Sequence, residues 1–212
     1  MNMPSTDVSA IIPVVGPAEH LAESIESVLV QTNPPHEVIV VGTAGASDTV
    51  RLFDGSVRFV QTRNTKIWGA CNLGVTFSRG TVLAFLGSND RWRPEKLQVQ
   101  IDLLQSKPRI DIVLGHSSWM DPTETGDHPG EPGLLAGTMI VHRQSFLRNG
   151  FFEEAVHDGV FSTWLSRAKD RGLGMEVVRE VVLEKRTPAS AIPAQPPAEA
   201  AITGPSSTRN GD

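Results

Sequence analysis

Short apolar runs alternate with amphipathic segments over the first half of the chain. The runs predict buried strands at residues 8–15, 37–41, 57–61 and 82–86. Between and after them, apolar residues at helical spacing predict helices at residues 18–32, 48–53, 64–79 and 94–105. Strands that alternate with helices form βαβ units. The pattern therefore predicts an α/β domain with a mostly parallel sheet.

The second half of the chain is more mixed. Strands are predicted at residues 111–114, 138–142 and 175–185, and helices at residues 144–149 and 160–171. Residues 121–133, rich in Pro, Gly and acidic residues, are predicted to form a loop. From residue 187 the chain is mainly Ala, Pro, Ser, Thr and Gly, which bury too little apolar surface to offset the entropy of ordering. We therefore expect a leader at 1–7, one domain at 8–186 and a disordered tail at 187–212.

One stretch stands where a ligand site is expected. The apolar run 82–86 is followed by Gly87, Ser88, Asn89 and Asp90. Residues that follow a parallel strand lie at its carboxyl end, where open α/β sheets bind ligands. The segment from Gly87 to Asp90 is therefore predicted to border a binding site.

Composition excludes several classes of function. The net charge is −5 and Lys and Arg form no long cluster, which argues against a nucleic-acid-binding surface. No run of about 20 apolar residues is present, so no membrane span is predicted. The single cysteine, Cys71, excludes an intrachain disulfide and a zinc site made of cysteines alone. It fits a reducing, cytoplasmic location, and a buried, unreactive thiol is the expectation for it.

Several segments together resemble family 2 glycosyltransferases. The matching segments are the strand Val8 to Val14, the helix Leu21 to Gln31 with its Ser-Val-Leu-x-Gln ending, the strand Glu37 to Val41, Asn72-Leu73-Gly74, the Trp92-x-Pro94-x-Lys96-Leu97-x-x-Gln100 segment, and Phe146, Gly150 and Phe152. The resemblance spans about residues 8–186. It implies a GT-A, Rossmann-like fold, which is a three-layer sandwich with a mostly parallel central sheet.

The same resemblance implies sugar transfer from a nucleotide-diphosphate donor. Family members carry an acid after the second strand, an Asp-x-Asp motif after the fourth strand that holds Mg or Mn, and an acidic catalytic base. Many also carry a late Arg or His near the diphosphate. The cation would offset the negative charge of the departing diphosphate.

This chain departs from the family pattern at nearly all of these places. Gly42 to Gly45 carries no acid, and Gly87-Ser88-Asn89-Asp90 stands where Asp-Ala-Asp-Asp is usual. Gly159-Val160 aligns with the Glu-Asp motif of the catalytic base, and Thr187 with the late His. No metal site and no cofactor are therefore expected. A divalent cation, Mg or Mn, is expected only if Asp90 still binds it.

The candidate site residues follow from the resemblance and from strand-end positions. They are Pro13, Lys66, Asn89, Asp90 and Arg91 for the donor, His116 and Trp119 for the acceptor cleft, and His157 and Asp158 for catalysis. Each has a structural alternative. Asp90 would cap the turn before the helix at 94–105, and His157 and Asp158 would lie in an exposed loop before a helix.

Other aromatic and histidine residues also allow two interpretations, a role in ligand binding or a structural role. Trp68 is a second ligand candidate near the cleft mouth, whereas Trp92 and Trp164 are predicted to be core residues. His116 and His142 each end a predicted strand, so they could meet with Asp121 in a replacement metal site. Their spacing matches no zinc pattern, and histidines that face solvent are the alternative.

Three functions fit these observations. The first is a pseudoenzyme that has lost metal-dependent transfer and binds a nucleotide sugar, a glycan or a protein partner. The second is an active, metal-independent glycosyltransferase, in which basic residues stabilise the leaving diphosphate. The residues suspected for that role are Lys66, Arg91, Arg93 and Arg143. The third is a small-ligand or peptide-binding module that uses the former acceptor cleft.

Overall fold

The computed structural model describes residues 6–17, 19–53, 55–63, 66–120, 131–154 and 159–186. The predicted tail and most of the predicted leader lie outside these residues, as do His157 and Asp158. Within them, no helix is long and apolar enough to cross a bilayer.

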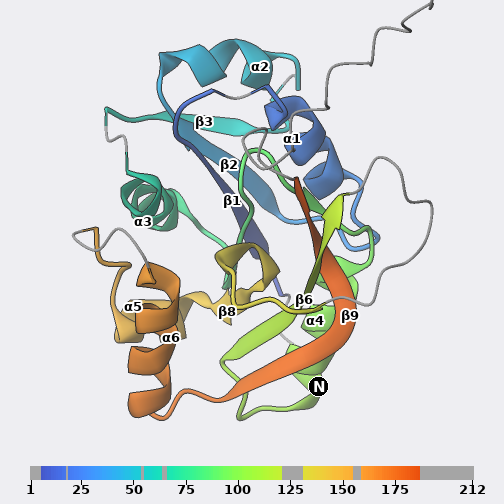
Figure 1. Ribbon diagram of the computed structural model, residues 1–212, viewed down its shortest axis with the longest axis vertical. Coiled ribbons are helices and arrows are strands. Elements are labelled where there is room, and N and C mark those ends of the chain that lie inside the picture. The colour runs from blue at the N-terminus through green and yellow to red at the C-terminus, as the bar shows by residue number, and fades with distance from the viewer. Residues whose placement is uncertain are drawn as a thin grey trace, which may run out of the picture.

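Nine strands form one sheet in the order β3-β2-β1-β4-β8-β6-β9-β5, with β7 paired to β6 (Figure 1). The strands are β1 (Val8–Val14), β2 (Glu37–Gly42), β3 (Arg58–Gln61), β4 (Val82–Phe85), β5 (Arg91–Trp92), β6 (Ile112–Met120), β7 (Glu131–Pro132), β8 (Ile140–His142) and β9 (Met175–Arg186). Strands β1, β2, β3, β4, β6 and β9 run in one direction, and β5, β7 and β8 run in the other. The predicted mostly parallel sheet is confirmed.

Helices cover both faces of the sheet, which makes three layers (Figure 1). The α-helices are α1 (Leu21–Leu29), α2 (Ser47–Arg51), α3 (Ile67–Phe77), α4 (Lys96–Ser106), α5 (Arg143–Asn149) and α6 (Val160–Asp170), with short 3₁₀ turns η1 (Ala44–Ala46) and η2 (Ala136–Thr138). Helices α1, α2 and α4 pack on one face, and α3, α5 and α6 on the other.

Alternation along β1 explains why both faces are apolar. Ala10 and Ile12 face the core beneath α1 and α4, whereas Ile11 faces α3, and all three are fully buried. Successive side chains of a strand point to opposite faces, so a strand covered on both faces must be apolar throughout. The continuous apolar runs in the sequence were therefore reliable signals of central strands.

The sheet order creates a switch point between β1 and β4. The chain builds outward from β1 to β2 and β3, and β4 then pairs with the other side of β1. The carboxyl ends of β1 and β4 meet at this point, which is the position where open α/β sheets bind ligands.

Two parts of the sheet differ from the prediction. Strand β6 continues to Met120 rather than ending at Leu114, and the two-residue strands β5 and β7 were not predicted. The second half of β6 is polar and exposed in part, and it is held by pairing with β9 and β7 rather than by burial. A pattern of apolar residues carries no signal for such strands.

Candidate functional site

The segment Gly87 to Asp90 forms a turn directly beyond β4 at the switch point. The last residue before it, Leu86, donates its backbone N–H to the carbonyl of Ile11 on β1 at 3.0 Å. The turn is closed by a hydrogen bond from the Asp90 N–H to the Gly87 carbonyl at 3.1 Å. The turn is therefore tied to both strands at the switch point.

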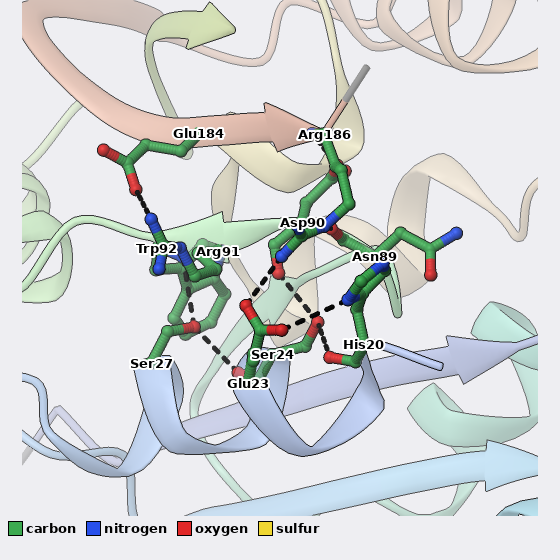
Figure 2. A network of polar contacts seen from close by, with 10 residues as sticks. All are labelled: His20, Glu23, Ser24, Ser27, Asn89, Asp90, Arg91, Trp92, Glu184 and Arg186. Carbon is green, nitrogen blue, oxygen red and sulfur yellow. Dashed lines mark hydrogen bonds and ion pairs between the residues drawn. The ribbon is translucent and has the colours of Figure 1, made fainter. Parts of the chain in front are cut away.

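Helix α1, which follows β1, holds the far end of this turn. Ser24 donates its hydroxyl to the Asp90 carbonyl at 2.7 Å, and Ser27 accepts from the Trp92 N–H at 3.1 Å (Figure 2). Both serines are buried on the face of α1 that meets β5. Small hydroxyl side chains at these two positions let the helix approach the turn and bond its backbone.

Arg186, at the end of β9, contacts the same turn from the other side. Its backbone N–H donates to Asp90 Oδ1 at 3.2 Å, and its Nε donates to the Asn89 carbonyl at 3.3 Å. Its Nη2 reaches across to Glu23 Oε2 on α1 at 2.6 Å, as Figure 2 shows. A guanidinium thus lies between the turn and the first turn of α1.

A second ion-pair group borders the turn on β5. Glu184 of β9 accepts from Arg91 at 3.1 Å and from Arg93 at 3.0 Å. The pairing follows from the register of β5 and β9, in which Arg91 lies opposite Glu184. The predicted donor residue Arg91 is therefore engaged with a carboxylate.

Burial and neighbouring charges act on the acids of the site in opposite directions. Burial raises the pKa of Asp90, and the Arg186 N–H together with the charges of Lys185 and Arg186 opposes that rise. The pKa of Glu23 is lowered, mainly by its hydrogen bond with His20 and further by Arg186. Glu23 is thus held as a carboxylate that neutralises Arg186, whereas the charged form of Asp90 is disfavoured.

The turn offers few oxygen ligands for a divalent cation. Mg and Mn are bound by several oxygen ligands, usually carboxylates. Here Asp90 is the one acid between Gly87 and Asp90, and its Oδ1 already accepts an N–H. The Asn89 carbonyl accepts from Arg186, and Glu23 is bonded to His20 and Arg186. Across the described ranges no three His, Cys, Asp or Glu residues are grouped to hold a metal ion.

The predicted acceptor residues lie on the neighbouring strand β6. Trp119 is 52% exposed, and Lys185 of β9, its partner in register, lies over its ring at 4.0 Å from Nζ to the ring centroid. His116 lies three residues earlier, half-buried, opposite Pro132 of β7. The role of Trp119 as an acceptor residue remains a prediction.

The remaining donor candidates are dispersed. Pro13 is buried within β1 opposite Val41, and Lys66 is exposed immediately before α3. Asn89 is exposed and contributes its backbone carbonyl to the network, while its side chain points away (Figure 2). The structure brings together Asn89, Asp90 and Arg91 but leaves the roles of Pro13 and Lys66 as predictions.

The structure decides between the alternative roles considered for Asp90 and Arg143. The expectation that Asp90 caps the turn before the next helix is wrong, because its carboxylate accepts the Arg186 N–H and α4 begins later, at Lys96. The expectation that Arg143 serves the diphosphate is also wrong. Its N–H donates to Thr81 and its Nε to Ser78, at the amino end of β4, which is the opposite edge of the sheet.

The structure also tests the proposed His116–His142 metal site and the interpretations of Cys71 and Trp68. The His142 N–H donates to the Asp111 carbonyl, so His142 lies beside the start of β6. His116 is further along the same strand, about 16 Å away at about 3.3 Å per residue. The two histidines therefore cannot share a metal ion. Cys71 is buried, as expected, and burial raises its thiol pKa to about 12. Trp68 is half-buried and packs against Phe152 at 4.8 Å between ring centroids.

Sequence reasoning missed Glu23, Ser24 and Arg186. The first two lie in the first turn of a helix read only for its apolar face. A late Arg or His was expected near the diphosphate, but the alignment pointed to Thr187, one residue beyond Arg186. The sequence did offer one signal for Arg186, which is its place at the end of the last predicted strand. The carboxyl ends of strands that run in one direction meet at one edge of the sheet, so a residue there should lie near the end of β4.

Comparison with known proteins gives consistent results. The model of the family described as Glycosyl transferase family 2 matches residues 9–170. An uncharacterized glycosyltransferase of Rickettsia conorii is 27% identical over 191 residues, which cover 80% of this chain and 31% of that protein. The Escherichia coli protein WfgD, named UDP-Glc:alpha-D-GlcNAc-diphosphoundecaprenol beta-1,3-glucosyltransferase, is 25% identical over 181 residues, covering 78% of this chain and 71% of WfgD.

The rickettsial relatives are several times longer than the match. The chain spans 21% of the Rickettsia felis protein and 31% of the R. conorii protein. Among solved structures, Staphylococcus aureus TarS 1–349 in complex with UDP-GlcNAc superposes with a TM-score of 0.71 at 16% identity, covering 86% of this chain and 59% of that one. TarS 1–349 alone gives the same TM-score. This similarity confirms the predicted GT-A fold.

Proposed function

Because the chain belongs to glycosyl transferase family 2, we propose that it is a family 2 glycosyltransferase domain that has lost metal-dependent sugar transfer and binds a nucleotide sugar or glycan as a pseudoenzyme module. Membership of the family sets the class of ligand. The residues of the Asp90 turn support the loss of the family's usual chemistry.

The observation that supports this proposal is the state of the turn from Gly87 to Asp90. The two positions that carry aspartates in the family pattern hold Gly87 and Asn89. The remaining acid, Asp90, is half-buried and bonded to the Arg186 N–H, and burial raises its pKa. A departing diphosphate would therefore lack the cation that normally offsets its charge.

The proposed ligand is a nucleoside diphosphate sugar. TarS, which shares the fold, is solved in complex with UDP-GlcNAc and with UDP, and WfgD is named for a UDP-Glc donor. We assign the acceptor-side surface to Trp119 and His116, since an exposed indole suits contact with a sugar ring. The donor side is assigned to Asn89 and Asp90, with Pro13 and Lys66 as the outlying candidates.

Calorimetric titration tests the proposal. The protein is titrated with UDP, UDP-GlcNAc, UDP-Glc and GDP, once with MnCl₂ and once with EDTA. We expect one of these ligands to bind with the same affinity in both buffers, and no release of nucleotide diphosphate above a blank. Micromolar binding that requires Mn would refute the proposal, and so would the absence of binding by any ligand in either buffer.

A second function has one observation in its favour. The guanidinium of Arg186 supplies a positive charge beside the turn, and an active enzyme could use such a charge in place of a metal ion. An assay for UDP release in EDTA, with a panel of sugar acceptors, separates the two functions. Turnover in EDTA that is unchanged by Mn would establish the metal-independent enzyme and exclude the pseudoenzyme.

A further inference from the structure

The chain between β7 and β8 crosses the carboxyl end of β4. Strand β8 runs antiparallel to β4 with Ile140 opposite Ala84, so the residues just before β8 lie beyond the end of β4. These residues include η2, and we call residues 133–138 the η2 segment. Its backbone therefore lies next to the strand that leads into the Asp90 turn.

The η2 segment is bonded within itself. The Thr138 hydroxyl lies within bonding distance of the Gly133 and Leu135 carbonyls, at 2.6 and 2.8 Å. The Thr138 N–H donates to the Leu135 carbonyl at 3.0 Å, and the Met139 N–H donates to the Ala136 carbonyl at 3.1 Å. Because these bonds join its two ends, the segment is expected to move as one unit.

Two buried side chains from other elements bond the backbone of the η2 segment. Gln100 of α4 donates its Nε2 hydrogens to the Thr138 carbonyl at 2.8 Å and to the Val113 carbonyl of β6 at 3.2 Å. Trp92 of β5 donates its Nε1 hydrogen to the Gly137 carbonyl at 3.2 Å. A buried carbonyl that loses its donor is costly, so both bonds favour one position of the segment.

Lys96 joins these two anchors. Its Nζ donates to Gln100 Oε1 and lies 5.0 Å from the centroid of the Trp92 ring. With Oε1 occupied by this donor, the amide of Gln100 keeps its two Nε2 hydrogens directed at the carbonyls of Val113 and Thr138. Lys96 therefore fixes the orientation of the Gln100 amide.

Burial of large apolar side chains holds the η2 segment only in part. Leu134 is 60% exposed and Leu135 is 39% exposed, whereas Gln100 and Trp92 are buried. The position of the segment thus depends strongly on the polar bonds that these two side chains make with its carbonyls.

We propose that Gln100 and Trp92 are positioning residues that latch the η2 segment at the carboxyl end of β4, and that the segment opens as one unit when this latch is released. The inference goes beyond the proposed function, because it concerns the chain alone and requires no ligand. It identifies how α4 and β5 control the backbone next to the strand that leads into the Asp90 turn.

Amide hydrogen exchange followed by NMR tests the latch, because amides that exchange through local opening report the free energy of that opening. The Thr138 and Met139 amides report on the η2 segment, and the Leu86 amide, bonded to Ile11 of β1, is the reference. In Gln100→Met we expect the two η2 amides to exchange about 10- to 100-fold faster relative to Leu86, since two buried hydrogen bonds are lost. Trp92→Phe removes one bond and should accelerate them by about 2- to 10-fold.

Gln31→Met is the matched control. Gln31 is also a buried glutamine, and its Nε2 donates to the Ser27 and Arg93 carbonyls at 3.0 and 2.8 Å. Its Oε1 accepts the Leu97 N–H at 3.0 Å. The variant therefore loses bonds of the same kind outside the η2 segment, and its η2 amides should exchange as in wild type relative to Leu86.

The outcomes separate a latch from a general contribution to stability. If Gln100→Met accelerates all three amides equally, or none of them, the inference is wrong. Selective acceleration of the η2 amides in Gln31→Met would also overturn it. If Gln100→Met does not fold, Trp92→Phe decides alone, and unchanged exchange of the η2 amides in that variant would refute the latch.

Discussion

Substitution of Lys96 by Met should stabilise this domain at neutral pH. Lys96 is the first residue of α4 and is only 1% exposed. Its Nζ contacts Gln100 Oε1 and lies 5.0 Å from the centroid of the Trp92 ring. No carboxylate is among these partners, and burial lowers the pKa of Lys96 well below its ordinary value of 10.5.

The magnitude follows from the cost of keeping lysine neutral. At about 1.4 kcal/mol per pH unit, the interval from 10.5 to pH 7 corresponds to at most about 5 kcal/mol. The cation–π contact with the Trp92 ring would stabilise a protonated Lys96 by about 2 kcal/mol, which lowers this upper limit on the cost of burial. Met fills a similar volume but leaves Gln100 Oε1 without its partner, which costs about 1–3 kcal/mol. We expect Lys96→Met to be more stable by up to about 2 kcal/mol at pH 7.

The pH dependence gives the sharper test. The folded pKa of Lys96 is lowered, so between the folded pKa and 10.5 the unfolded chain binds more protons than the folded one. The stability of wild type must therefore rise with pH in that window, relative to Lys96→Met. The slope is at most about 1.4 kcal/mol per pH unit. Near pH 10.5 the variant should have lost its advantage and be the less stable protein.

Urea unfolding of both proteins at pH 7, 8.5 and 10 measures this difference, with circular dichroism as the signal. Lys107→Met is the control, since the Lys107 side chain is 51% exposed and its removal should change stability little at any of these pH values. A stability difference between wild type and Lys96→Met that stays constant from pH 7 to 10 would show that Lys96 keeps its proton on folding. The reasoning from burial would then be refuted.

Three further predictions concern α3. Asn72→Ala removes both hydrogen bonds with the backbone of Phe152, at 2.9 and 3.0 Å, and should cost about 2–4 kcal/mol in urea unfolding; a loss below 1 kcal/mol would contradict it. Gly74→Ala would place Cβ 2.4 Å from Ile11 Cγ2 and should cost about 1–3 kcal/mol through overpacking, so unchanged stability would count against the packing. Cys71 should not react with a thiol reagent at pH 8 until the protein unfolds, because burial raises its pKa to about 12; rapid labelling of the native protein would contradict this.

The path of the chain through the layers was largely readable from the sequence. Continuous apolar runs predicted β1, β2 and β4 to within a residue or two, because strands covered on both faces must be apolar throughout. The apolar run at residues 82–86 also predicted that the Gly87 to Asp90 turn lies at the carboxyl end of a strand, where the structure has it. Helix ends were less accurate, and α1 begins at Leu21 rather than at residue 18.

The partners of that turn were not readable from the sequence. Arg186 meets Asp90 across 96 residues of chain and Glu23 across 163. Local patterns report which face of an element is buried, but which side chains meet at an edge depends on sheet order and register. Polar residues such as Glu23 and Ser24 also carry no periodic signal of their own.

The sequence by itself therefore determined the α/β class and the resemblance to family 2, and it set the expectation that the metal motif lacks its aspartates. Only the tertiary structure decided what stands there instead. The pairing of β9 beside β6 brings Arg186 to the same edge as the end of β4, and α1 supplies Glu23 opposite it. The physical reason is that burial is encoded locally along the chain, whereas the meeting of charged side chains is set by how distant strands are ordered in the sheet.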